Sequence, residues 1–129
     1  MIVVDASAIL EALLNTPRAP IVRQRLSSGE TLHAPHLLDL EVTQGLRRAF
    51  LSGRLSAVRA LQALEDLAGI RLARHPHDIY LPRIWELRHN VTAYDAAYLA
   101  LAEALDAPLV TCDKALASST GHDARIELL

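Results

Sequence analysis

The chain has 129 residues, of which 51% are hydrophobic and 22% are charged. This length suits one domain, and the composition excludes disordered, collagen-like and disulfide-rich proteins. Thirteen basic residues against fifteen acidic ones give a formal net charge of −2 with the six histidines neutral. This balance excludes a protein that binds nucleic acid through bulk positive charge alone.

Three features bear on the compartment in which the protein works. The single cysteine, Cys112, excludes an internal disulfide and fits a reducing environment. No basic segment precedes the first apolar run, and Asp5 and Glu11 interrupt that run, so we expect no signal peptide. The apolar stretch 96–102 is too short to span a bilayer and is followed by Glu103. We therefore expect a cytoplasmic protein without a membrane segment.

Short apolar runs alternate with helical patterns along the chain, which is typical of an α/β domain with a parallel sheet. The sequence predicts five strands, at residues 2–4, 31–34, 70–72, 109–112 and 126–128. It predicts helices at 7–14, from Pro20, and at 38–51, 56–68, 79–88 and 92–105. Because no repeat, low-complexity tract or linker divides the chain, residues 1–129 are expected to form one domain.

The composition of the strands predicts their order in the sheet. Strands 2–4 and 109–112 have apolar runs of the kind found in central strands covered by helices, whereas 70–72 and 126–128 alternate as edge strands do. We expect the first and fourth strands to be neighbours in the middle. A reversal of strand order leaves a crevice at the carboxyl ends of the strands, where ligands bind. Asp5 and Asp113, which follow these strands, mark the expected functional site.

Asp5 and Asp113 also have purely structural explanations. Asp5 stands just before the helix that begins near Ser7, where an acidic side chain can cap the free amides. Asp113 can likewise cap a short helix that extends to Ser118. Either residue, taken alone, is consistent with capping.

Two further acids lie on predicted helices. Glu41 borders the apolar stripe of helix 38–51, so it can reach into a cleft or pair with Arg48, which lies on the same face seven residues later. Asp95 is the last residue of Thr92-Ala93-Tyr94-Asp95, which matches a capping box. Each of these acids therefore also has an alternative role on its own helix.

Taken together, the four acids indicate a metal site. Carboxylates that converge repel one another unless protons or cations neutralise them. All-oxygen ligation suits Mg²⁺ or Mn²⁺, which activate water and offset charge on a phosphoryl centre, singly or as a pair about 3.5–4 Å apart. Ser7 and Thr111 lie two positions from Asp5 and Asp113 and can orient water at such a site. Simple hydroxyls at a helix end and a strand end are the alternative.

Four segments resemble the PIN domains in their order and spacing, and most of all the VapC-type toxins of bacterial toxin–antitoxin pairs. They are IVVDASA (2–8), LDLEV (38–42), TAYDAAY (92–98) and LVTCD (109–113). The resemblance covers essentially the whole chain, and TAYDA is its most specific part.

The resemblance implies a three-layer α/β/α domain with a parallel sheet of about five strands, often a homodimer. It also implies a Mg²⁺- or Mn²⁺-dependent endoribonuclease that acts on RNA and is blocked by a cognate antitoxin protein. Asp5, Glu41, Asp95 and Asp113 match the four acids of the family. Many relatives have a further acid shortly after the fourth, whereas residues 114–116 contain none, so one metal or two remain alternatives.

Within this interpretation, Asp5 and Asp95 hold the principal metal, and Asp113 and Glu41 complete the site directly or through water. An activated water attacks phosphorus in line, so that no carboxylate carries a covalent intermediate. Four basic residues are candidate phosphate contacts, with an ordinary solvated surface role as the alternative. They are Arg47, Arg48, Arg88 and Lys114.

Other classes also place an acid after the first strand. Phosphoaspartate receivers have paired acids there, and haloacid-dehalogenase-like phosphatases need a second Asp two positions later, where this chain has Ser7. The alternative from another functional class is a catalytically silent PIN-like module that binds protein or RNA. Metal-dependent cleavage of RNA distinguishes it from a nuclease.

Overall fold

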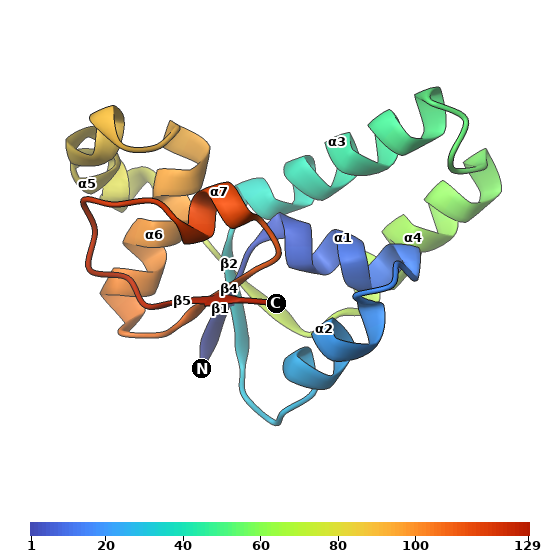
Figure 1. Ribbon diagram of the computed structural model, residues 1–129, viewed down its shortest axis with the longest axis horizontal. Helices are drawn as coiled ribbons and strands as arrows, with labels where there is room; N and C mark the ends of the chain where they lie inside the picture. Colours follow the sequence, from blue (N-terminus) through green and yellow to red (C-terminus); the bar gives the residue numbers. More distant parts are fainter.

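The computed structural model describes residues 1–129 as a parallel five-stranded sheet between two layers of helices (Figure 1). The expected α/β/α fold is confirmed. The strands are β1 (Ile2–Val4), β2 (Leu32–Pro35), β3 (Leu72–His75), β4 (Leu109–Thr111) and β5 (Ile126–Leu128). The helices α1 (Ala6–Leu14), α2 (Ala19–Leu26), α3 (Leu37–Leu51) and α4 (Ala57–Gly69) lie on one side, and α5 (Leu81–Glu86) and α6 (Ala93–Leu105) on the other. The short α7 (Lys114–Ala117) follows β4.

The strand order is β3-β2-β1-β4-β5, with every neighbouring pair parallel. This confirms that the first and fourth strands are neighbours in the middle. All residues of β1 and β4 are buried, whereas the edge strands β3 and β5 are partly exposed, so the apolar pattern did report position in the sheet. The chain leaves β1 toward β2 and returns to its other side at β4, which creates the switch point beside β1.

Two predicted elements differ from the observed ones by more than one residue at an end. The third strand is Leu72–His75 instead of 70–72, because Ile70 still ends α4 and the pairing with β2 begins at Leu72. The predicted helix 79–88 is divided into a 3₁₀ turn (Asp78–Tyr80), α5 and a second 3₁₀ turn (Leu87–His89). Pro82 has no amide hydrogen to donate to the Asp78 carbonyl, which instead accepts from Leu81 in a 3₁₀ turn.

Small residues bring the helices that carry the candidate acids close to their neighbours. A Cβ atom at Gly45 would lie 2.5 Å from Leu10 Cδ1, so glycine lets the Leu10 side chain of α1 pack directly on the backbone of α3. On α6, four buried alanines allow the helix to pack on β1 and β2. They are Ala96, Ala97, Ala100 and Ala102. The positions of Glu41 and Asp95 thus follow from close packing.

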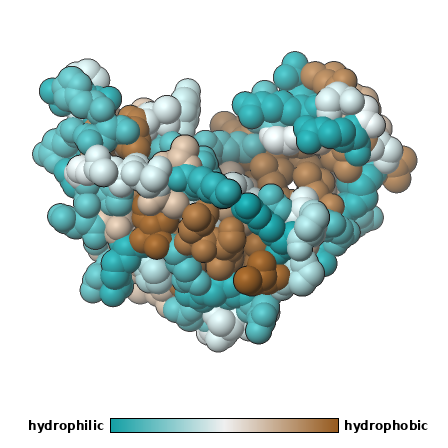
Figure 2. Space-filling view, viewed as in Figure 1, coloured by the Kyte–Doolittle hydropathy of each residue, from teal (hydrophilic) through white to brown (hydrophobic).

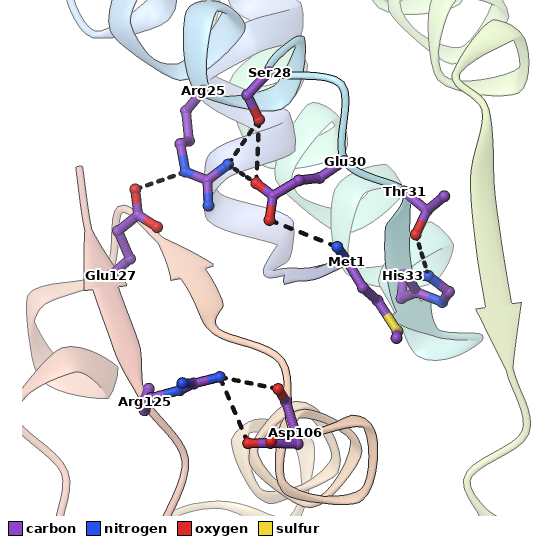
Figure 3. Close-up of polar contacts among 9 residues, drawn as sticks. All are labelled: Met1, Arg25, Ser28, Glu30, Thr31, His33, Asp106, Arg125 and Glu127. Carbon is purple, nitrogen blue, oxygen red and sulfur yellow. Dashed lines mark hydrogen bonds and ion pairs between the residues drawn. The ribbon is translucent and has the colours of Figure 1, made fainter.

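Ion pairs join neighbouring segments at the end of the sheet at which the strands begin (Figure 3). Arg25 binds Glu127 with 2.7 Å between Nε and Oε1, and it also binds Glu30. Arg125 lies 3.5 Å from a carboxylate oxygen of Asp106.

None of the helices combines the length and hydrophobicity that a bilayer crossing requires.

Candidate active site

A cavity of about 390 Å³ opens where β1 and β4 end, between α1, α3 and α6. All four candidate acids line it: Asp5 and Asp113 from the turns after β1 and β4, Glu41 from α3 and Asp95 from α6. The structure therefore brings together acids from four separate segments of the chain. The remaining lining residues are Ala6, Ser7, Leu10, Leu37, Leu40, Gln44, Gly45, Arg48 and Tyr94.

Asp5 caps α1, and three donors hold one oxygen of its carboxylate. Oδ2 accepts from Ser7 Oγ at 2.5 Å, from Thr111 Oγ1 at 2.8 Å and from the Ser7 amide at 3.3 Å. Ser7 Oγ also accepts from the Cys112 amide at 2.9 Å, which ties α1 to the end of β4. Asp5 and Thr111 are the two buried polar residues of the chain, at 6% and 0% exposure, and they satisfy each other. No protein donor reaches Asp5 Oδ1.

Asp113 caps α7 and also lines the cavity, so the two interpretations of this residue are compatible. Its Oδ1 accepts from the amides of Ala115 at 2.8 Å and Leu116 at 3.4 Å. Its own amide donates to Thr111 Oγ1 at 3.0 Å, so one threonine hydroxyl contacts both Asp5 and Asp113. The second oxygen, Oδ2, receives no hydrogen bond from the protein.

Glu41, on α3, is held by a side chain from α6. The Tyr98 hydroxyl donates to Glu41 Oε2 at 2.6 Å, and the alternative ion pair with Arg48 does not form. Burial raises the pKa of the Glu41 carboxyl, and the charges of Asp5 and Asp95 add to the rise, while the Tyr98 hydrogen bond opposes it. Burial and the neighbouring carboxylate also raise the pKa of Tyr98, which keeps its hydroxyl protonated as a donor.

Asp95 forms only half of the capping box that its sequence predicts. Its amide donates to Thr92 Oγ1 at 3.2 Å, but no reciprocal hydrogen bond runs from the Thr92 amide to the Asp95 carboxylate. That carboxylate lines the cavity instead. Burial raises the pKa of Asp95, and repulsion from Asp5 and Asp113 raises it further.

The charge of the cavity is not balanced from within the protein. None of the chain's ion pairs includes any of the four acids, and three of the acids keep one oxygen free of protein donors. The acids line the walls without gathering three at one point. Mg²⁺ bound by few carboxylates keeps several waters, and the cavity is many times the roughly 30 Å³ of one liquid water. The donor set, charge and space thus fit a hydrated divalent cation.

Three of the four predicted phosphate contacts lie at or beside the cavity. Arg48 lines it, and the exposed Lys114 begins α7 next to Asp113. Arg88 lines a polar groove of about 730 Å³ that meets the cavity at Asp95. This groove is continued by residues 89–92 and 118–120, which carry mostly polar side chains.

The fourth predicted contact, Arg47, lies elsewhere. It lines an apolar groove between α3 and α4, where Figure 2 shows hydrophobic side chains in the hollow between the two helices. The structure therefore does not bring Arg47 to the acids. The apolar residues of this groove are Leu46, Phe50, Ala57, Ala60, Leu61 and Leu64.

Sequence reasoning missed three residues at the site. Gln44 lies one helical turn after Glu41, and Tyr98 one turn after Asp95, so helical spacing could have indicated both. Tyr94 is the immediate neighbour of Asp95 and lines the cavity. No local pattern predicts the bond between Tyr98 and Glu41, because 57 residues separate them.

Comparison with known proteins agrees with this architecture. The PIN domain family model matches residues 2–120. Ribonuclease VapC9 of Mycobacterium tuberculosis is 49% identical over 122 residues, which cover 95% of this chain and 92% of the relative. Ribonuclease VapC1 of the same organism is 46% identical over 131 residues, with 98% and 96% covered. The crystal structure of PAE2754 from Pyrobaculum aerophilum superposes with a TM-score of 0.70 at 27% identity, over 96% of this chain and 81% of that one. The chain therefore belongs to the PIN domain family and, within it, to the VapC ribonucleases.

Proposed function

We propose that this protein is the toxin of a toxin–antitoxin pair and a metal-dependent endoribonuclease that hydrolyses RNA phosphodiester bonds. The observation that carries the proposal is one cavity lined by four carboxylates, none of which forms an ion pair with a basic side chain. The relatives named as VapC ribonucleases supply the class of reaction. The single domain predicted for residues 1–129 remains part of this proposal, and the use of segments from residue 5 to residue 113 in one site supports it.

The cofactor we propose is Mg²⁺ or Mn²⁺, held mainly by Asp5 and Asp95 and completed by Asp113 and Glu41. When bound, such an ion lowers the pKa of water and offsets the charge that develops at phosphorus. Ser7 and Thr111 occupy Asp5 Oδ2, which fixes the carboxylate and leaves Oδ1 for the ion. The mutual repulsion of these acids is relieved by the same positive charge.

The RNA strand would pass through the acid cavity and the polar groove, which meet at Asp95. Arg48 and Arg88 would bind phosphates on either side of the scissile bond, because the planar guanidinium matches two phosphate oxygens, and Lys114 would add a point charge. The acids would orient the attacking water opposite the leaving oxygen for an in-line displacement. Arg47 would not bind these phosphates, because it lies in the groove between α3 and α4.

Two protein contacts belong to the proposal. The apolar groove between α3 and α4, where Phe50 is 46% and Leu61 59% exposed, is a surface for the cognate antitoxin. Exposed apolar residues on and near α5 provide a second surface, which we assign to a homodimer. They are Ile79, Leu81 and Trp85. We place the protein in the cytoplasm, because its proposed substrate is RNA.

Incubation of the purified protein with a mixed RNA pool tests the nuclease directly. We expect cleavage with Mg²⁺ or Mn²⁺, none with excess EDTA, and none with the folded Asp95→Asn variant. The Asp66→Asn variant is the matched control, because Asp66 is exposed on α4 away from the cavity, and it should cut like the wild type. Cleavage that survives EDTA or Asp95→Asn would contradict the proposal. Binding of RNA without any cleavage would favour the silent binding module.

A further inference from the structure

The fold tethers the four acids by different means. Asp5 and Asp113 each cap a helix, so free amides at the starts of α1 and α7 contribute to holding them. Glu41 lies beyond the first turn of α3, where the backbone amides are already used by the helix itself. Glu41 therefore depends on a side-chain donor, and the one it has comes from another element.

Tyr98 is that donor and the sole protein group that donates to the Glu41 carboxylate. It lies on α6, one turn after Asp95, and its side chain is fully buried at 0% exposure. A buried tyrosine hydroxyl needs a hydrogen-bond partner, and the 2.6 Å distance to Oε2 is that of a strong bond to a carboxylate. One hydroxyl thus connects α6 and α3, which approach the cavity from different sides of the sheet (Figure 1).

We propose that Tyr98 is a positioning residue of the cation site, whose hydroxyl fixes Glu41 in the cavity and leaves Oε1 free for the ion. This inference rests on the proposed function of the acid cavity and adds a residue outside the four acids. A glutamate side chain turns about three bonds, and a tether that restricts them before the ion arrives lowers the entropic cost of binding. Outer groups that orient metal ligands typically change metal affinity 10–100-fold when removed.

Tyr98→Phe removes the hydroxyl and keeps the buried ring. Calorimetric titration with Mn²⁺, below the unfolding temperature of each variant, should show an affinity about tenfold lower than that of the wild type. Tyr80→Phe is the matched control, because the Tyr80 ring packs partly buried against the core and its hydroxyl makes no hydrogen bond. We expect the control to bind Mn²⁺ like the wild type.

Two readouts separate positioning from a general loss of structure. In a Glu41→Gln background, Tyr98→Phe should change the Mn²⁺ affinity less than about twofold, since no carboxylate is left to position. In the metal-free protein, Tyr98→Phe should shift the ¹³C resonance of the Glu41 carboxyl and leave that of the distant Glu65 carboxyl unchanged.

Unchanged Mn²⁺ affinity in Tyr98→Phe, or equal losses in both backgrounds, would overturn the role of Tyr98. A wild-type protein that binds Mn²⁺ but leaves RNA intact would overturn the nuclease alone, and the affinity comparison would still decide the role of Tyr98. A wild-type protein that binds no Mn²⁺ would overturn both.

Discussion

The two ends of the sheet treat acidic side chains in opposite ways. Where the strands begin, Glu30 and Glu127 share Arg25, and Asp106 faces Arg125 (Figure 3). Where β1 and β4 end, four acids line one cavity and none has an ion pair. The number of acids alone therefore says little, and their partners distinguish a closed surface from a site that needs an external cation.

The directions of the pKa shifts express the same difference. The hydrogen bond from Arg25 lowers the pKa of Glu30. Burial raises the pKa of Glu41 and of Asp95, and neighbouring carboxylates reinforce both rises. The end where the strands begin thus stabilises the charged form of its carboxylates. The cavity at the other end destabilises that form, and a bound cation would offset this cost in free energy.

The largest expected difference is between two Asp→Asn variants, one at each end of the sheet. Asp5→Asn should reduce metal-dependent RNA cleavage more than about a hundredfold. Removal of a group that only orients a metal ligand typically costs 10–100-fold, and Asp5 is itself a proposed ligand. Asparagine keeps an oxygen for Ser7 and Thr111, so the fold should persist. Asp106→Asn is the control, because Asp106 is exposed and has φ 46°, a conformation that asparagine accepts. Equal activity of the two variants would remove the distinction between the ends.

A smaller loss is expected when the support of Asp5 is removed and Asp5 itself is kept. Thr111→Val deletes a fully buried hydroxyl that contacts Asp5 and the Asp113 amide. Mn²⁺ affinity should fall about tenfold. Chemical denaturation should show a loss on the order of 1 kcal/mol or more, since buried polar groups lose a partner. Thr43→Val, which removes a hydroxyl on the exposed side of α3, should change neither quantity appreciably.

Glu41→Gln should make the metal-free protein more stable while it weakens the cation site. Because the folded state raises the pKa of Glu41, stability is lost as pH rises through that pKa, and glutamine lacks this loss. We expect a gain below about 1 kcal/mol at pH 7 after allowance for solvent screening. Denaturation near about pH 3.5 should show little gain, because Glu41 is then protonated in both states. A gain of equal size at both pH values would mean that charge is not its cause.

The smallest expected effect is a loss of stability as pH falls, and it comes from His33 in β2. His33 contacts Thr31 at 2.9 Å and His75 at 2.8 Å, and burial with the charge of His75 lowers the pKa of His33. The unfolded chain therefore binds more protons as pH falls below about 6.5, so stability should drop by a few tenths of a kcal/mol between about pH 7 and pH 5. Urea denaturation of His33→Gln should show a shallower drop. Identical slopes for the two proteins would exclude His33 as the source.

The sequence predicts the centre of this molecule better than its periphery. The wholly apolar β1 and β4 identify the middle of the sheet, and the acids after them lie at its switch point, because burial on both faces leaves a clear pattern. The third strand was misplaced because edge strands are short and half-exposed. The helix over 79–88 was expected to be continuous although Pro82 removes a needed amide.

Contacts between distant segments limit how much of the candidate site can be predicted from the sequence. Each acid was visible in the sequence, but its cap, its free oxygen and its missing ion pair depend on tertiary structure. The bond from Tyr98 to Glu41 joins two helices, and Arg47 faces away from the acids although it adjoins Arg48. Neighbouring positions on a helix point in different directions, so adjacency in sequence did not imply a shared role.

Calorimetric titration of the wild-type protein with Mn²⁺, beside Asp5→Asn and Asp106→Asn, tests the central claim most directly. The claim is that the unbalanced acids at the ends of β1 and β4 form the cation site. It predicts saturable binding of one or two ions by the wild type and by Asp106→Asn, and its loss in Asp5→Asn. Equal binding by all three proteins, or no binding by the wild type, would contradict it.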